Sequence, residues 1–232
     1  GDFLFSRSFQ IMVECGSLHV LEILSNASAV IAEGEVQQLA NTNDLSISKS
    51  DCLAVITAKT AQLFAAACQI GAVVADQPRP ISQALEHFGL NFGIGFQLID
   101  DLIDYSASDK TIGKKVGDDF REGKVTLPVL LTYQKGSKDE REFWKRTIEH
   151  GIIQEGDLEF AIKTMKKQNI GKKILLKMTV ATFLIMLITS FILLLRPVTC
   201  TLWNLRCRIC RIIVVLRWRC WKLVVCCVLA LP

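Results

Sequence analysis

The stretch Gly95-Phe96-Gln97-Leu98-Ile99-Asp100-Asp101-Leu102-Ile103-Asp104-Tyr105 decides the fold. Its aspartates recur at positions i, i+1 and i+4, so a helix projects Asp100 and Asp104 from one face and places Asp101 beside them. Apolar residues fill most of the other positions, which indicates that this helix is largely buried. Buried carboxylates that lie close together repel one another unless a cation neutralises them. The stretch therefore predicts a helical protein with a metal site, in preference to a solvated acidic face.

The ligands of this predicted site are oxygen atoms and include no imidazole. Asp100, Asp101 and Asp104 supply carboxylates, and Gln97 lies one turn earlier on the same face. Oxygen ligands without histidine suit Mg²⁺, which usually takes one or two carboxylates together with waters and phosphate oxygens. We therefore expect Mg²⁺ at this helix.

Helical patterns extend from this stretch in both directions. Apolar residues recur at helical spacing, and the polar residues 48–51 offer candidates for a helix N-cap. Helices are expected at 2–16, 17–41, 48–75, 82–105, 125–133 and 156–167, with a charged surface helix after residue 133. Two prolines predict a loop at 76–80, and polar residues and glycines predict another at 106–122. Since no strand pattern appears, the body of the chain is predicted to be all-α.

Three glycines lie inside the helix expected at 82–105, namely Gly89, Gly93 and Gly95. Each costs roughly 1 kcal/mol relative to alanine in a helix interior. We therefore expect another element to pack closely against the backbone of this helix.

The composition changes abruptly near residue 169. The chain of 232 residues has a formal net charge of +4, but all 23 acidic residues come before residue 170, whereas ten of the 27 basic residues follow it. Six of the nine cysteines also follow it. We therefore divide the chain into residues 1–169 and residues 170–232. The other three cysteines lie in apolar helical stretches and indicate the reduced thiols of a cytoplasmic protein.

Three interpretations of residues 170–232 remain open. The lack of acidic residues and of capping signals favours a segment unrelated to the body, such as an out-of-frame translation. The uncharged residues 178–195 are just long enough for a membrane span, with a basic segment after it at the lipid surface. A metal or nucleic-acid tail is the third interpretation, and Cys207-Arg208-Ile209-Cys210 supports it only weakly because no second pair accompanies it. We expect no nucleic-acid partner and no catalytic role for this segment.

Residues 96–104 resemble the second aspartate-rich motif of the trans-polyprenyl diphosphate synthases, and other motifs agree in order and spacing. These are Gly1-Asp2-Phe3-Leu4-Phe5-Ser6-Arg7, Glu33-Gly34-Glu35 with Gln38-Leu39, Ala58-Lys59-Thr60, Gly113-Lys114-Lys115-Val116-Gly117-Asp118-Asp119, and Glu122-Gly123-Lys124-Val125-Thr126-Leu127-Pro128. The resemblance covers residues 1–169 and in detail is similar to the bacterial long-chain enzymes of the octaprenyl and decaprenyl type.

The resemblance implies an antiparallel helix bundle of the isoprenoid synthase type around a central cavity. It also implies a prenyltransferase that condenses isopentenyl diphosphate with an allylic prenyl diphosphate, elongating a polyprenyl chain for a quinone. In such an enzyme Asp100 and Asp104 would hold a Mg²⁺ that bridges the diphosphate oxygens, with Asp101 as a further ligand.

The resemblance assigns roles to five other residues. Lys59 and Lys115 would donate to the diphosphate oxygens, and Lys124 would support the acidic cluster. The Thr60 hydroxyl and the Gln97 amide oxygen would face the developing allylic cation.

The first aspartate-rich motif of the family, with its arginine pair, does not occur in this sequence. The resemblance therefore implies a bundle that is incomplete at its N-terminus and a chain that is inactive alone. It implies a homodimer only where the dimer-forming helices are intact. Two alternatives remain open, namely a non-catalytic partner subunit of a prenyl synthase and an enzyme of the class I terpene cyclase type. A membrane protein whose helical body is a cytosolic module is a third.

Overall fold

The structure, a computed structural model, describes residues 1–105 and 116–176, and every regular element in those two ranges is helical. The elements are α1 (Asp2–Glu14), α2 (Leu18–Ala40), α3 (Lys49–Ile56), the π-helix η1 (Thr57–Ala61), α4 (Gln62–Val74), α5 (Arg79–Ile103), α7 (Asp118–Arg121), α8 (Leu127–Lys135), α9 (Lys138–Trp144), the π-helix η2 (Lys145–Glu149) and α10 (Asp157–Lys167). Residues 170–176 are helical as well. The all-α prediction is confirmed.

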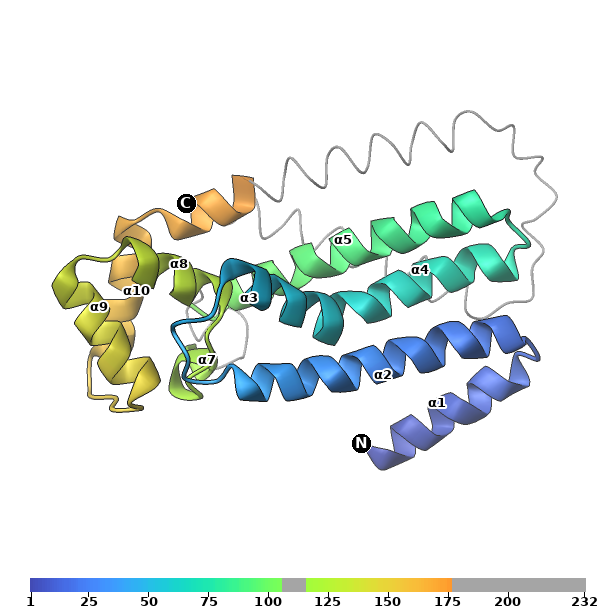
Figure 1. Ribbon diagram of the computed structural model, residues 1–232, viewed down its shortest axis with the longest axis horizontal. Coiled ribbons are helices and arrows are strands. Elements are labelled where there is room, and N and C mark those ends of the chain that lie inside the picture. The colour runs from blue at the N-terminus through green and yellow to red at the C-terminus, as the bar shows by residue number, and fades with distance from the viewer. Residues whose placement is uncertain (106–115, 177–232) are drawn as a thin grey trace.

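Long helices lie side by side and alternate in direction (Figure 1). Helix α4 packs along α5 and against α2, while η1 lies between α2 and α5. The short helices α7, α8, α9 and α10 gather at one end of this bundle, where α2 and α5 finish. The antiparallel bundle that was expected is therefore present, and its short helices close one end.

Close contacts at glycines set the distance between the long helices. A Cβ atom added to Gly89 would lie 2.3 Å from the carbonyl oxygen of Phe64, and one added to Gly93 would lie 2.5 Å from the Cα atom of Ala61. These neighbours are backbone atoms and cannot move aside without shifting a helix. The close packing predicted from Gly89 and Gly93 is confirmed.

The helix expected at 48–75 is interrupted near its middle. Its N-cap is Ser48, one of the candidates at 48–51, which forms a capping box with Asp51. The chain then winds as a π-helix over Thr57–Ala61 before α4 begins. Such π-turns are often found at functional sites, and periodicity alone did not reveal this one.

Two loop predictions extended too far. Helix α5 begins at Arg79 and accommodates Pro80 in its first turn, where the missing N–H would have no helical partner in any case. The short helix α7 lies within the loop expected at 106–122, and residues 106–115 of that loop lie outside the described residues.

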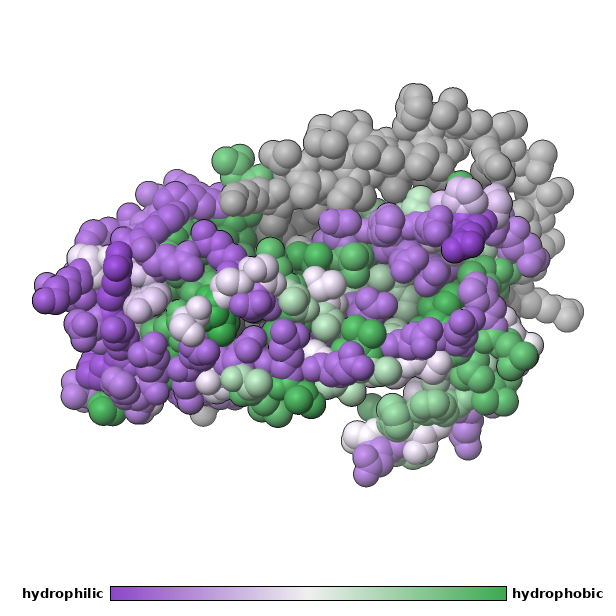
Figure 2. Space-filling model, in the orientation of Figure 1, coloured by the Kyte–Doolittle hydropathy of each residue, from purple (hydrophilic) through white to green (hydrophobic). Residues whose placement is uncertain are grey.

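Helix α1 leaves most of its apolar side chains exposed. Only Met12 is buried, whereas Phe3, Leu4 and Val13 are each more than half exposed. Figure 2 shows hydrophobic surface around the corner where α1 meets α2. This face therefore has no cover among the described residues.

By length and composition, Lys49–Val74 is the one helical stretch of the described chain that could cross a membrane. It packs inside the bundle against α2 and α5 and carries Lys59, so we interpret it as a core helix. The span expected at 178–195 and the pair Cys207–Cys210 lie outside the described residues.

A partly buried ion pair joins η2 to α10 at the end of the bundle where the short helices gather. The Arg146 guanidinium donates to both carboxylate oxygens of Asp157, at 2.8 and 2.9 Å, and the backbone N–H of Gln154 donates to the same carboxylate at 2.7 Å. These hydrogen bonds, that of Arg146 first, hold the pKa of Asp157 below its ordinary value although burial opposes them.

The glycine contacts predict opposite effects for two matched substitutions. Gly89→Ala should lower the free energy of unfolding by about 1–3 kcal/mol because its methyl group meets backbone. Gly171→Ala, in the helical residues 170–176 with no atom within 4 Å, should raise that free energy by up to about 1 kcal/mol. Urea unfolding followed by circular dichroism measures both. A Gly89→Ala protein as stable as wild type would show that the close approach is no constraint.

The Asp157 ion pair predicts a pH-dependent contribution to stability. Because the folded pKa of Asp157 is depressed, the contribution is complete above the ordinary carboxyl pKa and is lost as pH falls through the folded value. Asp157→Asn should therefore destabilise the protein by about 1–3 kcal/mol at neutral pH and by clearly less near about pH 3. Urea unfolding at both pH values tests this, and a deficit that is equal at both would contradict it.

Candidate functional site

A cavity of about 270 Å³ opens between the C-terminal ends of α2 and α5, the π-helix η1 and the segment that leads into α8. Six of the predicted site residues line it together: Lys59, Thr60, Gln97, Asp100, Asp101 and Lys124. Apolar side chains complete the wall, among them Ile47, Val55, Ile56, Val125 and Leu127. The structure thus brings together, at one cavity, residues that are as much as 65 positions apart in the chain.

Two carboxylates of α5 share one amide at this cavity. The Gln97 Nε2 group donates to Asp101 Oδ1 at 2.8 Å and lies 3.4 Å from Asp100 Oδ2. Asp101 is buried, and its burial, opposed by the Gln97 hydrogen bond and reinforced by the charges of Asp119, Asp100 and Asp104, raises its pKa to about 7. A negative charge on Asp101 is therefore costly in the absence of a nearby cation.

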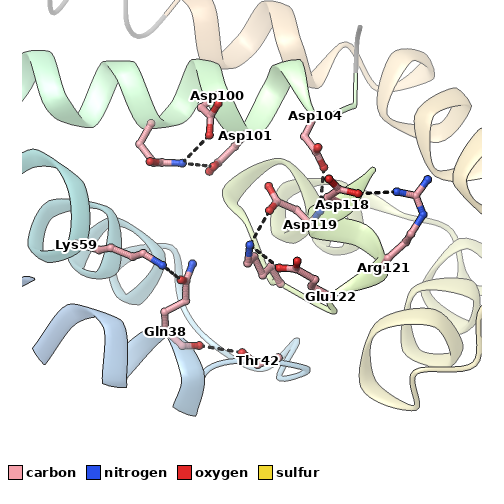
Figure 3. A network of polar contacts seen from close by, with 12 residues as sticks. Gln38, Thr42, Lys59, Asp100, Asp101, Asp104, Asp118, Asp119, Arg121 and Glu122 are labelled. Carbon is pink, nitrogen blue, oxygen red and sulfur yellow. Dashed lines mark hydrogen bonds and ion pairs between the residues drawn. The ribbon is translucent and has the colours of Figure 1, made fainter. Parts of the chain in front are cut away.

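Asp104 takes a different direction from its two neighbours. Its Oδ2 atom accepts a hydrogen bond from the backbone N–H of Asp119 at 3.1 Å, and its carbonyl oxygen accepts one from Gly117 at 2.9 Å. Figure 3 shows Asp104 turned toward α7, while Asp100 and Asp101 lie farther back along α5. Asp104 therefore anchors the start of α7.

Within residues 1–105 and 116–176, no three carboxylate, thiol or imidazole groups are arranged as a preformed metal site. Chelation of one cation by Asp100 and Asp104 accordingly stays a prediction.

The π-helix η1 supplies the part of the wall that adjoins α5. The Thr60 hydroxyl donates to the Gln97 amide oxygen at 2.9 Å, so Gln97 accepts from η1 with one end of its amide and donates to the carboxylates with the other. Lys59 Nζ contacts α2, where it donates to Gln38 Oε1 (Figure 3). It also lies 2.6 Å from Glu35 Oε2. Thr60, Gln97 and Asp101 thus form a continuous hydrogen-bonded chain along the cavity wall.

Lys124 lies on the third side of the cavity. Its ammonium group is 2.7 Å from Glu122 Oε2 and 3.1 Å from Asp119 Oδ1. Partial burial alone would lower the pKa of Lys124, but the hydrogen bonds to Glu122 and Asp119 outweigh it and raise the pKa. Lys124 therefore remains a cation at the cavity at any physiological pH.

Sequence reasoning gave no role to Asp119 and Gln38, the two lining residues that contact Lys124 and Lys59. Both stand inside segments that carry the family resemblance, so a signal was present, but nothing in their spacing pointed to the cavity. Lys115, which was expected to bind diphosphate, lies outside the described residues.

Comparisons with known proteins agree with this geometry. The family model for polyprenyl synthetase matches residues 1–165. The chain is 46% identical over 151 residues to octaprenyl diphosphate synthase of Escherichia coli, covering 65% of this chain and 47% of that protein. It is 38% identical over 130 residues to heptaprenyl diphosphate synthase component 2 of Geobacillus stearothermophilus, covering 56% of this chain and 41% of that protein.

A solved structure shares the fold. The polyprenyl synthase of Caulobacter crescentus, in complex with calcium and isoprenyl diphosphate, superposes with a TM-score of 0.72 at 46% identity, covering 79% of this chain and 55% of that one. The chain thus spans about half the length of the relatives it matches. Since the family model matches well over half of the sequence, this chain belongs to the polyprenyl synthetase family.

Proposed function

We propose that this chain is part of a prenyltransferase that condenses isopentenyl diphosphate with an allylic prenyl diphosphate and so elongates a polyprenyl chain, for a quinone side chain. The observation that carries the proposal is the convergence of Lys59, Thr60, Gln97, Asp100 and Asp101 on one cavity. Family membership and the octaprenyl relative support the same reaction and favour it over a terpene cyclase.

The reaction begins when the C–O bond of the allylic diphosphate breaks and the diphosphate leaves with the electron pair. That step needs positive charge around the leaving oxygens. Lys59 lines the cavity and Lys124 lies across it, with Lys115 as a further donor in the proposal. The double bond of isopentenyl diphosphate then attacks the allylic cation, and the released diphosphate takes the proton that is lost. The protein needs to supply no nucleophile.

Thr60 and Gln97 would stabilise the cation. Their oxygen atoms lie 2.9 Å apart at the cavity wall. An oxygen dipole held in place beside a developing positive charge stabilises it without reorganisation during the reaction. The second hydrogen bond of the Gln97 amide, to Asp101, fixes which end of that amide faces Thr60.

The carboxylates of α5 fit a divalent cation, and we propose Mg²⁺. Asp100 and Asp101 line the cavity, and burial, reinforced by the neighbouring carboxylates, raises the pKa of Asp101. A nearby cation would offset both effects. Asp104 is proposed as a further ligand. Bound Mg²⁺ would neutralise the diphosphate charge and so improve the leaving group.

Assembly and organisation are also part of the proposal. A homodimer would cover the exposed apolar face of α1, and likeness to a protein named component 2 supports a partner subunit as the alternative. We propose residues 1–169 as the catalytic region of a cytoplasmic enzyme and residues 170–232 as a distinct segment that contacts the membrane through 178–195. The two would join in the helical residues 170–176, where Ile170 and Ile174 pack into the core with α3, α5 and α8.

An elongation assay tests the reaction. Labelled isopentenyl diphosphate, an allylic diphosphate and Mg²⁺ would be given to this chain and to a version extended upstream by a first aspartate-rich segment. We expect only the extended version to elongate, with a loss of about 10²-fold or more in kcat for Asp100→Ala or Lys59→Ala. Asp139→Ala, on an exposed position of α9, is the matched control and should leave kcat unchanged.

Other outcomes of this assay separate the alternatives. Elongation by the chain as printed would show that its site is complete. Failure of both versions, combined with binding to an intact synthase, would replace the enzyme by a partner subunit.

The proposed metal site predicts that Asp101 lowers the stability of the metal-free protein and is needed for stabilisation by Mg²⁺ with diphosphate. At pH 8 without metal, Asp101→Asn should raise the free energy of unfolding, because it removes a buried negative charge. The same variant should lose the further stabilisation that Mg²⁺ with inorganic diphosphate gives the wild type. Thermal unfolding with EDTA and with Mg²⁺ measures both effects, against Asp139→Asn. A less stable Asp101→Asn protein in EDTA would contradict this account.

A further inference from the structure

The Lys59 ammonium group is held by two residues of α2 that have no assigned role. Its Nζ atom donates to Gln38 Oε1 and forms an ion pair with Glu35 Oε2 at 2.6 Å. Figure 3 shows the Lys59 side chain extended from η1 to Gln38. Glu35 and Gln38 are three positions apart, so they project from the same face of α2. They form a cradle for the lysine head group.

The backbone makes this cradle possible. A Cβ atom at Gly34 would lie 2.8 Å from the backbone nitrogen of Lys59 and 2.8 Å from Ala58 Cβ. Glycine thus lets α2 approach η1 so closely that the side chain of its neighbour Glu35 reaches Lys59. Lys59 lies within the π-helix η1 at this point of contact.

Stability alone does not explain the cradle. Glu35 is half exposed and Lys59 is one-third exposed, and ion pairs this exposed contribute little to folding. The two contacts instead restrict the conformation of the Lys59 side chain. A lysine side chain has a flexible four-carbon stem, and holding it in one geometry before a ligand arrives removes part of the entropy cost of binding. An ammonium group has three N–H donors, and the cradle uses two of them.

We propose that Glu35 and Gln38 are positioning residues that fix Lys59 at the cavity wall, so that its third N–H is directed at a bound diphosphate. The inference rests on the proposed function, because it assumes that Lys59 binds a diphosphate. Gln38 also lines the cavity itself, which places the cradle beside the ligand.

A second effect of Glu35 opposes the first. Its negative charge lowers the positive potential that attracts an anion, so its removal could strengthen binding. That effect is weak at an exposed position in salt. Glu33→Gln, on an exposed position two residues away, removes the same charge without touching Lys59 and therefore measures it.

The test is calorimetric titration of the full chain with inorganic diphosphate at saturating Mg²⁺. The proteins are wild type, Glu35→Gln, Gln38→Met, Lys59→Ala, the double variant Glu35→Gln/Lys59→Ala, and the control Glu33→Gln. Relative to the control, Glu35→Gln and Gln38→Met should each weaken binding by about three- to tenfold. In the Lys59→Ala background, Glu35→Gln should have no further effect, since Glu35 acts through Lys59. Circular dichroism and the melting temperature of each variant confirm folding.

Each outcome decides the matter. The cradle is supported if Glu35→Gln weakens diphosphate binding in the wild-type background but not in the Lys59→Ala background, and if the melting temperature is unchanged. The cradle is overturned if Glu35→Gln leaves diphosphate binding unchanged or tighter, or if it weakens binding equally in both backgrounds. The proposed function stands in these cases as long as the wild type binds diphosphate. If wild type does not bind diphosphate, the proposed function fails and this inference fails with it.

Discussion

The contact between α5 and the α3–η1–α4 segment is the constraint on which the site depends. At Gly89 and Gly93 the two backbones approach so closely that even a methyl group does not fit between them. Farther along α5, the same close approach lets Gln97 contact Thr60 of η1. On the other side of η1, Gly34 allows α2 to lie close to the backbone of Lys59. The cavity lies where these helices end together, so its walls are fixed by glycines outside it.

The side-chain amide of Gln97 connects two parts of the cavity wall. Gln97 accepts from Thr60 and donates to Asp101, so it connects the wall that would face a cation with the carboxylates that would hold a metal. The two lysines at the cavity also have acidic partners. Lys59 is balanced by Glu35 and Lys124 by Glu122 and Asp119. Asp101 differs, because it is buried and its charged neighbours are acidic, and both effects raise its pKa.

Much of this could be predicted from the sequence, for physical reasons that differ from residue to residue. The aspartate spacing and the buried glycines are local patterns, and both pointed correctly to a packed helix carrying clustered carboxylates. The partners of Lys59 could not be foreseen, because a contact between α2 and η1 depends on how two helices meet and not on spacing within either one. Asp104 shows the same limit. On an ideal helix it shares a face with Asp100, but the start of α7 provides a backbone N–H that draws its carboxylate away.

The π-helix between α3 and α4 changes how the two halves of that segment are registered. One extra residue in a turn advances every side chain beyond it by about 100° around the helix axis. Helix α3 can thus present Cys52 and Ile56 to α5 and α8, while α4 presents Ala66 and Ile70 to α2. In an alignment of relatives, a one-residue gap here would be more than a length difference. It would indicate that α3 is rotated differently about its axis relative to the bundle, and that the cavity therefore has a different shape where α3 lines it.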